Sequence, residues 1–260
     1  MSSPLSKEQL QQYKIVDWGY TEKAAAESYT HFSEWVEKGD VGPLVYLTGE
    51  RKETRESLEH FFPQYQSALV FLFSYAHEKK ALDEFYQSAD SNGLKIASYV
   101  LGFAGYDYHD LVKEQLQDIS AKLQKEDPQL QVKLAMDVHP VLDRDLAYRA
   151  GLGWFGKNSM MIHRKEGSFT IIGSLLLSKK MNLKKSSAVE TDHCGQCRKC
   201  IQACPTDAID EENRRIFADR CISTYTIELF KDAPEIPGHV DNGGGEIFGC
   251  DICQDVCPWN

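Results

Sequence analysis

Three segments of the chain carry apolar residues at helical spacing. The pattern predicts helices over residues 7–38 (in two pieces broken near Trp18–Gly19, the second ending at Gly39), 108–126 and 143–150. The 108–126 helix has the most regular pattern, with one apolar face formed by Leu111, Val112, Leu116, Ile119 and Leu123.

Three shorter apolar runs predict strands, at residues 68–75, 130–137 and 168–177. The first, A-L-V-F-L-F-S-Y, has no polar alternation and is typical of a strand buried on both faces. The polar, lysine-rich stretch 179–192 then reads as a linker. The sequence thus predicts an α+β domain followed by a smaller cysteine-rich module, with the two domains at residues 1–185 and 186–260.

Composition excludes some classes of protein. The chain has 260 residues, a formal net charge of −10 and 42% hydrophobic residues, which is ordinary for a globular protein. This charge argues against nucleic-acid binding by bulk attraction but leaves room for a local basic groove. No run approaches about 18 apolar residues, and the polar start has no signal core. We therefore expect a cytoplasmic protein without a membrane span.

All eight cysteines lie between Cys194 and Cys257. The first run reads C-G-Q-C-R-K-C-I-Q-A-C-P, which is the C-x₂-C-x₂-C-x₃-C-P pattern of two-cluster bacterial ferredoxins. The second run reads C-D-I-C-Q-D-V-C-P, and Cys221 lies between the two. Two [4Fe–4S] clusters need eight thiolates, so the count leaves none over.

Ferredoxin topology assigns these ligands, because the fourth cysteine of a run binds the other run's cluster. One cluster is expected on Cys194, Cys197, Cys200 and Cys257. The second is expected on Cys204, Cys221, Cys250 and Cys253. The alternative is zinc, but zinc sites usually use two C-x₂-C pairs separated by a longer loop, which fits this spacing poorly.

Two short motifs suggest other chemistry. Residues 151–156 match G-x-G-x-x-G, but a helix-like segment precedes them and extended chain follows, which is the wrong context for a dinucleotide site. Asp107 and His109 begin a D-x-H pattern found in corrinoid proteins, yet the next expected glycine is Val112. We expect Asp107 to be a helix N-cap and His109 to be a residue of the first turn, not a cobalt ligand.

Longer stretches of the chain resemble the epoxyqueuosine reductase family, which is related to the corrinoid reductive dehalogenases. The resemblance is carried by residues 105–109 (G-Y-D-Y-H), 137–144 (D-V-H-P-V-L-D-R), 150–158 (A-G-L-G-W-F-G-K-N), 221–228 and 248–260. It covers nearly the whole chain and is weakest over residues 1–50. Many relatives continue into a helical-repeat tail, whereas this sequence ends at Asn260.

The resemblance implies a function. Members of this family reduce the epoxide of epoxyqueuosine at the tRNA wobble position to queuosine, the last step of queuosine biosynthesis, with cobalamin and two [4Fe–4S] clusters. It also implies a cobalamin-binding α/β sandwich-like domain before the ferredoxin-like module. The expected partners are tRNA carrying epoxyqueuosine and an unidentified low-potential electron donor, and the protein is expected to be a monomer.

The same resemblance implies site residues. Asp137 matches the proton donor to the leaving oxygen, and burial under a corrin should raise its pKa above the ordinary 3.9 or so. The expected cofactor contacts are Arg55, Asp137, Met161, Ile172, Ser223, Glu228, Cys250 and Asp251. A basic surface for tRNA phosphates is expected from Lys157, Arg164, Lys165, Lys179, Lys180, Lys184 and Lys185.

Two other functions remain open from the sequence. One is a corrinoid-dependent reductase of a small halogenated or epoxide substrate, against which the missing export signal counts. The other is a non-catalytic iron–sulfur electron carrier, against which the large first domain and Asp137 count.

Overall fold

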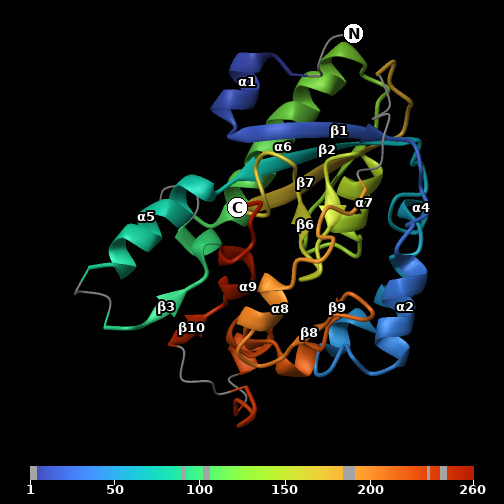
Figure 1. Cartoon of the computed structure of the whole chain (residues 1–260). Helices are drawn as coiled ribbons and strands as arrows, with labels where there is room; N and C mark the ends of the chain where they lie inside the picture. The colour runs from blue at the N-terminus through green and yellow to red at the C-terminus, as the bar shows by residue number, and fades with distance from the viewer. Residues whose placement is uncertain (1–4, 89–91, 102–105, 184–190, 233–234, 241–244) are drawn as a thin grey trace.

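A computed structural model describes residues 5–88, 92–101, 106–183, 191–232, 235–240 and 245–260 (Figure 1). At its centre is an antiparallel sheet whose strands lie in the order β1 (Ile15–Thr21), β2 (Ser67–Ser74), β7 (Thr170–Leu177) and β4 (Val132–Ala135). Three of these strands were predicted from the sequence. The α+β class is confirmed.

Helices cover both faces of this sheet. The helix α6 (Tyr108–Glu126) packs on one face, and α7 (Asp143–Arg149) with α4 (Leu58–Phe61) packs on the other. Every residue of β2 from 67 to 73 is buried, because alternate side chains of a strand point to opposite faces and both faces are covered. The prediction of a strand buried on both sides is therefore confirmed, as are the helices at 108–126 and 143–150.

The helix α6 lies close to the sheet at Gly173 of β7. A Cβ at this position would lie 2.9 Å from the Phe73 ring, 3.0 Å from Val112 and 3.1 Å from Leu116. Since real Cβ atoms rarely approach so closely, the absence of a side chain at Gly173 sets how near α6 can approach. Because α6 begins at Tyr108, the packing of Val112 and Leu116 at Gly173 also positions the first turn of this helix.

Residues 15–21, predicted to be helical, form the strand β1 instead. The strand pairs antiparallel with β2, and at Gly19 it passes so close to Ala150 that a Cβ would lie 2.4 Å from its carbonyl oxygen. Tertiary pairing with a buried strand overrides a short helical pattern here. The second predicted piece is also shorter than expected: the helix α2 spans Tyr29–Glu37 and ends at Gly39, whose φ is +81°.

The remaining elements are short. Those of the first domain are α1 (Lys7–Gln12), η1 (Val45–Leu47), α3 (Glu50–Thr54), α5 (Ala76–Tyr86), β3 (Lys95–Ile96), η3 (Ser98–Leu101), β5 (Trp154–Phe155) and β6 (Met161–Ile162). Those of the cysteine module are α8 (Lys199–Ala203), β8 (Ile209–Asp210), β9 (Arg215–Ile216), η4 (Ala218–Arg220), η5 (Thr224–Glu228), η6 (Phe230–Asp232), β10 (Glu246–Phe248) and α9 (Ile252–Asp255).

The glycine motif at 151–156 follows the helix α7 and leads into the β5–β6 hairpin, as expected for a segment that is not a dinucleotide site. Gly151, with φ +77°, ends α7, and its N–H and that of Leu152 bond to the carbonyls of Tyr148 and Ala147. A Cβ at Gly153 would lie 2.1 Å from the Ile162 carbonyl oxygen. The glycine therefore lets the backbone of this motif approach the β5–β6 hairpin closely.

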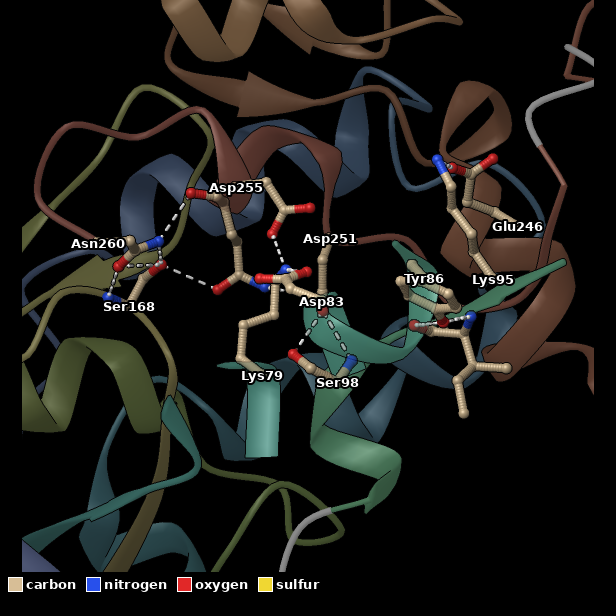
Figure 2. Close-up of polar contacts among 12 residues, drawn as sticks. Lys79, Asp83, Tyr86, Lys95, Ser98, Ser168, Glu246, Asp251, Asp255 and Asn260 are labelled. Carbon is tan, nitrogen blue, oxygen red and sulfur yellow. Dashed lines mark hydrogen bonds and ion pairs between the residues drawn. The ribbon is translucent and has the colours of Figure 1, made fainter. Parts of the chain in front are cut away.

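The cysteine module, orange to red in Figure 1, lies against the first domain between α5 and α2. The strand β10 pairs in parallel with β3, and Trp35 of α2 donates to the Ile216 carbonyl at 2.6 Å. Lys79 of α5 pairs with both Asp83 and Asp255, the latter at 3.0 Å (Figure 2).

Two further contacts in Figure 2 join the modules. The Asp251 carboxylate accepts hydrogen bonds from the Ser98 backbone N–H (2.7 Å) and hydroxyl (2.5 Å). Ser168 donates its hydroxyl to Gln254 (2.9 Å) and its backbone N–H to the Asn260 side chain (2.6 Å). We call these contacts, with those of Lys79 and β10, the seam between the modules.

Within the described ranges, no helix combines the length and apolar content needed to cross a bilayer. The predicted linker lies partly outside those ranges, since residues 184–190 are not described. The domain boundary at 185/186 falls there and stays a prediction.

The packing of α6 gives a test of the core. Leu116 is fully buried between α6 and the sheet, so Leu116→Ala should lower the free energy of unfolding by about 2–5 kcal/mol through lost burial and a residual cavity. Lys113→Ala, on the exposed face of the same helix, should change it by less than about 0.5 kcal/mol. Denaturant titration of both variants measures the difference, and equal values would contradict this packing.

Candidate active site and cluster sites

Asp137 lies in the turn after β4 and is held by two side chains from the start of α6. The Tyr108 hydroxyl donates a short hydrogen bond to Oδ2, and His109 Nε2 lies 3.3 Å from Oδ1. The Asp137 side chain is 51% exposed in the protein alone, so its expected burial would have to come from the corrin and stays a prediction. The turn puts the carboxyl on a cavity wall and not under the sheet.

His109 in turn contacts Asp107, which caps α6 as predicted. Asp107 Oδ1 accepts the His109 backbone N–H at 2.9 Å and lies 2.8 Å from His109 Nδ1. The backbone hydrogen bond, followed by the bond to the ring, lowers the pKa of Asp107. An ionised Asp107 fixes a proton on Nδ1, so that Nε2 faces Asp137.

This pairing has a consequence for protons. His109 Nε2 lies within ion-pair distance of Asp137 Oδ1, at 3.3 Å, so the imidazole is placed to exchange a proton with the carboxyl. Burial and the neighbouring Asp137 charge raise the pKa of Tyr108, so its hydroxyl remains a donor to the carboxylate. The D-Y-H triplet was interpreted only as a helix start, and this role of His109 was missed.

A cavity of about 470 Å³ opens beside Asp137. Its first-domain wall includes the predicted contacts Arg55, Met161 and Ile172, together with Phe32 and Asp143. The cysteine module closes another side with Glu228, also a predicted contact, and with Arg214, Arg215 and Ile216. The sequence thus identified five residues, Arg55, Asp137, Met161, Ile172 and Glu228, that meet around one space.

Arg55 and Glu228 are each held by neighbours at this cavity. Arg55 is 6% exposed and donates to the Arg51 carbonyl at 2.6 Å, and burial followed by the Arg51 charge lowers its pKa. Glu228 accepts the Tyr46 hydroxyl at 2.7 Å. Fixed polar groups around an apolar space of this size are typical of a site for a large organic ligand.

Three of the expected cofactor contacts, Ser223, Cys250 and Asp251, do not line the cavity. Ser223 precedes η5, and the Asp251 carboxylate accepts two hydrogen bonds from Ser98 in the seam. Cys250 lies among the thiols of the second predicted cluster. A role of these residues toward the cofactor stays a prediction.

Four thiols, Cys194, Cys197, Cys200 and Cys257, line a second, smaller cavity of about 50 Å³. They come from both cysteine runs and form the set assigned to the first cluster. Among the described residues, no three potential ligands converge on a single metal ion. Four thiols spread around a small cavity suit a cubane cluster, whose ligands bind four different irons.

The other four cysteines also lie together. Cys253 is half-buried, and burial, followed by the charges of Cys250, Cys221 and Cys204 and then that of Cys200, raises the pKa of its thiol; the first three of these cysteines complete the set assigned to the second cluster. Burial, together with the charges of Glu246, Cys221 and Asp251, raises the pKa of the Cys250 thiol to about 12. Without a cation such thiols keep their protons, so iron would supply the positive charge that stabilises eight thiolates. All eight are free of disulfides.

The cobalamin expected from the sequence is consistent with the larger cavity. The side chains that line it include the cations Arg55 and Arg144, the acids Asp137 and Asp143, and the apolar residues Met161 and Ile172. Asp143 Oδ1 is buried without a hydrogen bond from any described residue, as is expected where a polar ligand binds. Arg55, Met161 and Ile172 would hold such a ligand.

Known families match both parts of the chain. Residues 55–138 match the family model "Epoxyqueuosine reductase QueG, DUF1730", and residues 193–260 match "4Fe-4S double cluster binding domain". The second match confirms the paired [4Fe–4S] module.

Solved structures share the fold. An epoxyqueuosine reductase from Streptococcus thermophilus superposes with a TM-score of 0.74 at 24% identity, over 98% of this chain and 65% of that one. An epoxyqueuosine reductase with an epoxyqueuosine-modified tRNA stem loop gives 0.69 at 22% identity, over 97% and 64%. The chain thus spans just under two thirds of these structures. A catabolic reductive dehalogenase gives 0.50 at 16% identity, over 75% and 26%.

Among curated proteins, epoxyqueuosine reductase from Cyclobacterium marinum is 35% identical over 238 residues, which cover 90% of this chain and 71% of the relative. Epoxyqueuosine reductase from Pseudomonas aeruginosa is 31% identical over 257 residues, covering 95% and 68%. The chain therefore belongs to the epoxyqueuosine reductase family of oxidoreductases.

Proposed function

We propose that this protein reduces the epoxide of epoxyqueuosine in tRNA to the alkene of queuosine, with cobalamin in the large cavity and two [4Fe–4S] clusters in the cysteine module. The observation that carries the proposal is the placement of Asp137. A carboxyl group with its own proton supply lies on the wall of a cavity whose opposite wall belongs to a two-cluster module.

The reaction requires two electrons and two protons, since both C–O bonds of the epoxide break, a C=C bond forms and the oxygen leaves as water. The clusters supply electrons one at a time, and low-valent cobalt is the centre that cobalamin would supply for the two-electron step. Asp137 donates a proton to the leaving oxygen. His109 then returns a proton to Asp137 through the Nε2–Oδ1 contact, while Tyr108 keeps the carboxyl oriented.

The charges around the cavity suit a ligand that carries phosphate. Arg51, Arg55 and Arg144 lie at or beside its wall, although the whole chain has a net charge of −10. Arg214 also lines it but pairs with Asp192 at 2.5 Å. Arginine is well suited to phosphate because its guanidinium can form two parallel hydrogen bonds. These arginines are a better candidate for tRNA phosphates than the basic surface expected from the sequence.

Most residues of that basic surface are paired or lie outside the described ranges. Lys157 is buried near Glu211 (3.6 Å), Lys179 pairs with Asp127 (2.5 Å), and Lys180 pairs with Glu22 (3.1 Å). Arg164 contacts His193, and Lys165 is exposed. Lys184 and Lys185 lie outside the described residues.

The two other functions gain little support. The likeness to a reductive dehalogenase at 16% identity concerns the fold alone. An electron carrier has no need of the cavity or of the Asp137–His109 pair. Nucleoside analysis of tRNA from a deletion strain tests the proposal: epoxyqueuosine should accumulate, and unchanged queuosine would contradict it.

Asp137→Asn tests the proton donor. The amide keeps the size of the side chain but has no acidic proton, so reduction of an epoxyqueuosine stem loop should slow by about 10²–10⁴-fold. Iron, sulfide and cobalamin contents should match those of the wild type. Glu114→Gln, an exposed change on α6, is the control and should leave the rate unaltered. Wild-type turnover by Asp137→Asn would exclude this role.

Cysteine variants test the crossed ligand sets. Because Cys257 is assigned to the first cluster and Cys204 to the second, Cys257→Ala and Cys197→Ala should lose the same electron paramagnetic resonance signal, while Cys204→Ala and Cys253→Ala should lose the other. Each variant should retain roughly half of the iron. If Cys257→Ala lost the same signal as Cys253→Ala, each run would instead bind its own cluster.

A further inference from the structure

The first turn of α7 carries two acidic residues in contrasting surroundings. Asp145 is 1% exposed and fully paired: Arg149 Nε donates to its Oδ2 at 2.6 Å, and the Ser28 backbone N–H donates to its Oδ1 at 2.7 Å. Asp143 has a buried Oδ1 to which no described residue donates. Since buried polar atoms in native proteins are nearly always hydrogen bonded, this oxygen needs an explanation.

The position of Asp143 supplies one. Its side chain lines the same cavity as Asp137, to which it is joined by the turn of residues 137–143. Arg149 secures α7 through Asp145, so the helix does not depend on Asp143 for an ion pair. Asp143 as a whole is half-buried and lines the cavity, so its carboxyl group lies beside whatever occupies that space.

The protonation state of Asp143 follows from its neighbours. Burial, and then the negative charge of Asp137, raises its pKa to about 8. The cations that face it, Arg144 on the same helix and Arg55 after α3, oppose this shift without cancelling it. At neutral pH the group is a neutral acid with a proton to donate, and it becomes a carboxylate as the pH rises through about 8.

The proposed reaction requires a second proton. Removal of the epoxide oxygen as water consumes two protons, and a single carboxyl group such as Asp137 donates only one at a time. We propose that Asp143 is the second acid of the cavity, which hydrogen bonds to the oxygen of the bound epoxide and supplies the second proton that leaves with it as water. This inference rests on the proposed function.

The step balances with groups already named. Two C–O bonds break and a C=C bond forms, and two electrons come from the iron–sulfur module. One proton comes from Asp137 and one from Asp143, which give a molecule of water. Both carboxylates then regain protons from solvent, Asp137 through His109.

The test measures the proton and the turnover separately. Infrared titration of the holoenzyme should show a protonated carboxyl band at pH 7 that disappears as the pH rises through about 8. The band should be absent in Asp143→Asn and present in Glu212→Gln, which changes an exposed carboxyl outside the cavity. If this band is missing in the wild type, or persists in Asp143→Asn, the assignment is overturned.

Single-turnover reduction of an epoxyqueuosine stem loop gives the second measurement. In the wild type, the rate should fall above about pH 8, where Asp143 loses its proton. Asp143→Asn should slow the reaction at pH 7 by at least about tenfold, and its rate should no longer fall above about pH 8. Asp143→Glu should retain both the fall in rate at high pH and the infrared band of the protonated carboxyl. This variant therefore tests the proposal even if Asp143→Asn fails to fold. A wild-type rate and pH profile in Asp143→Asn would overturn the proposal while leaving the proposed function intact. An inactive wild type would overturn both.

Discussion

The seam between the sheet domain and the cysteine module is the constraint on which the site depends. In the proposed reaction, electrons arrive through one module and protons through the other, so both must be held at a fixed separation from the same cavity. The carboxylate of Asp251 accepts two hydrogen bonds from Ser98, and Lys79 reaches Asp255. Hydrogen bonds to charged groups contribute about 1.5–3 kcal/mol each, more than neutral ones. A few such contacts are sufficient to fix the geometry.

Within the cavity, two carboxyl groups from one turn experience different electrostatics. Asp137 is half-exposed, bonded to Tyr108 and in contact with His109, whereas Asp143 has a buried Oδ1 that accepts no hydrogen bond from the described residues. Environments that separate two acids in this way allow each to serve a different purpose at the same pH. The Asp145–Arg149 pair fixes the helix α7, which begins at Asp143, so this asymmetry needs no support from Asp143 itself.

Sequence reasoning succeeded where the chemistry is local. The cysteine spacing predicted a two-cluster module, which the family match confirms, and α6 follows from its own 3.6-residue period. It failed where distant contacts decide. Residues 15–21 form a strand because β2 is there to pair with. The exposure of Asp137 and its contact with His109 likewise depend on how a turn and a helix end meet, which no periodicity encodes.

The missing side chain at Gly173 has an effect beyond the core. Val112 and Leu116 rest on that glycine, and the same helix begins with the hydroxyl and the imidazole that hold Asp137. An added methyl group in the middle of the sheet would push the helix outward and shift its first turn by a fraction of an ångström. Inherited changes in the interior of this protein would then first alter how quickly it turns over, well before they affect whether it folds.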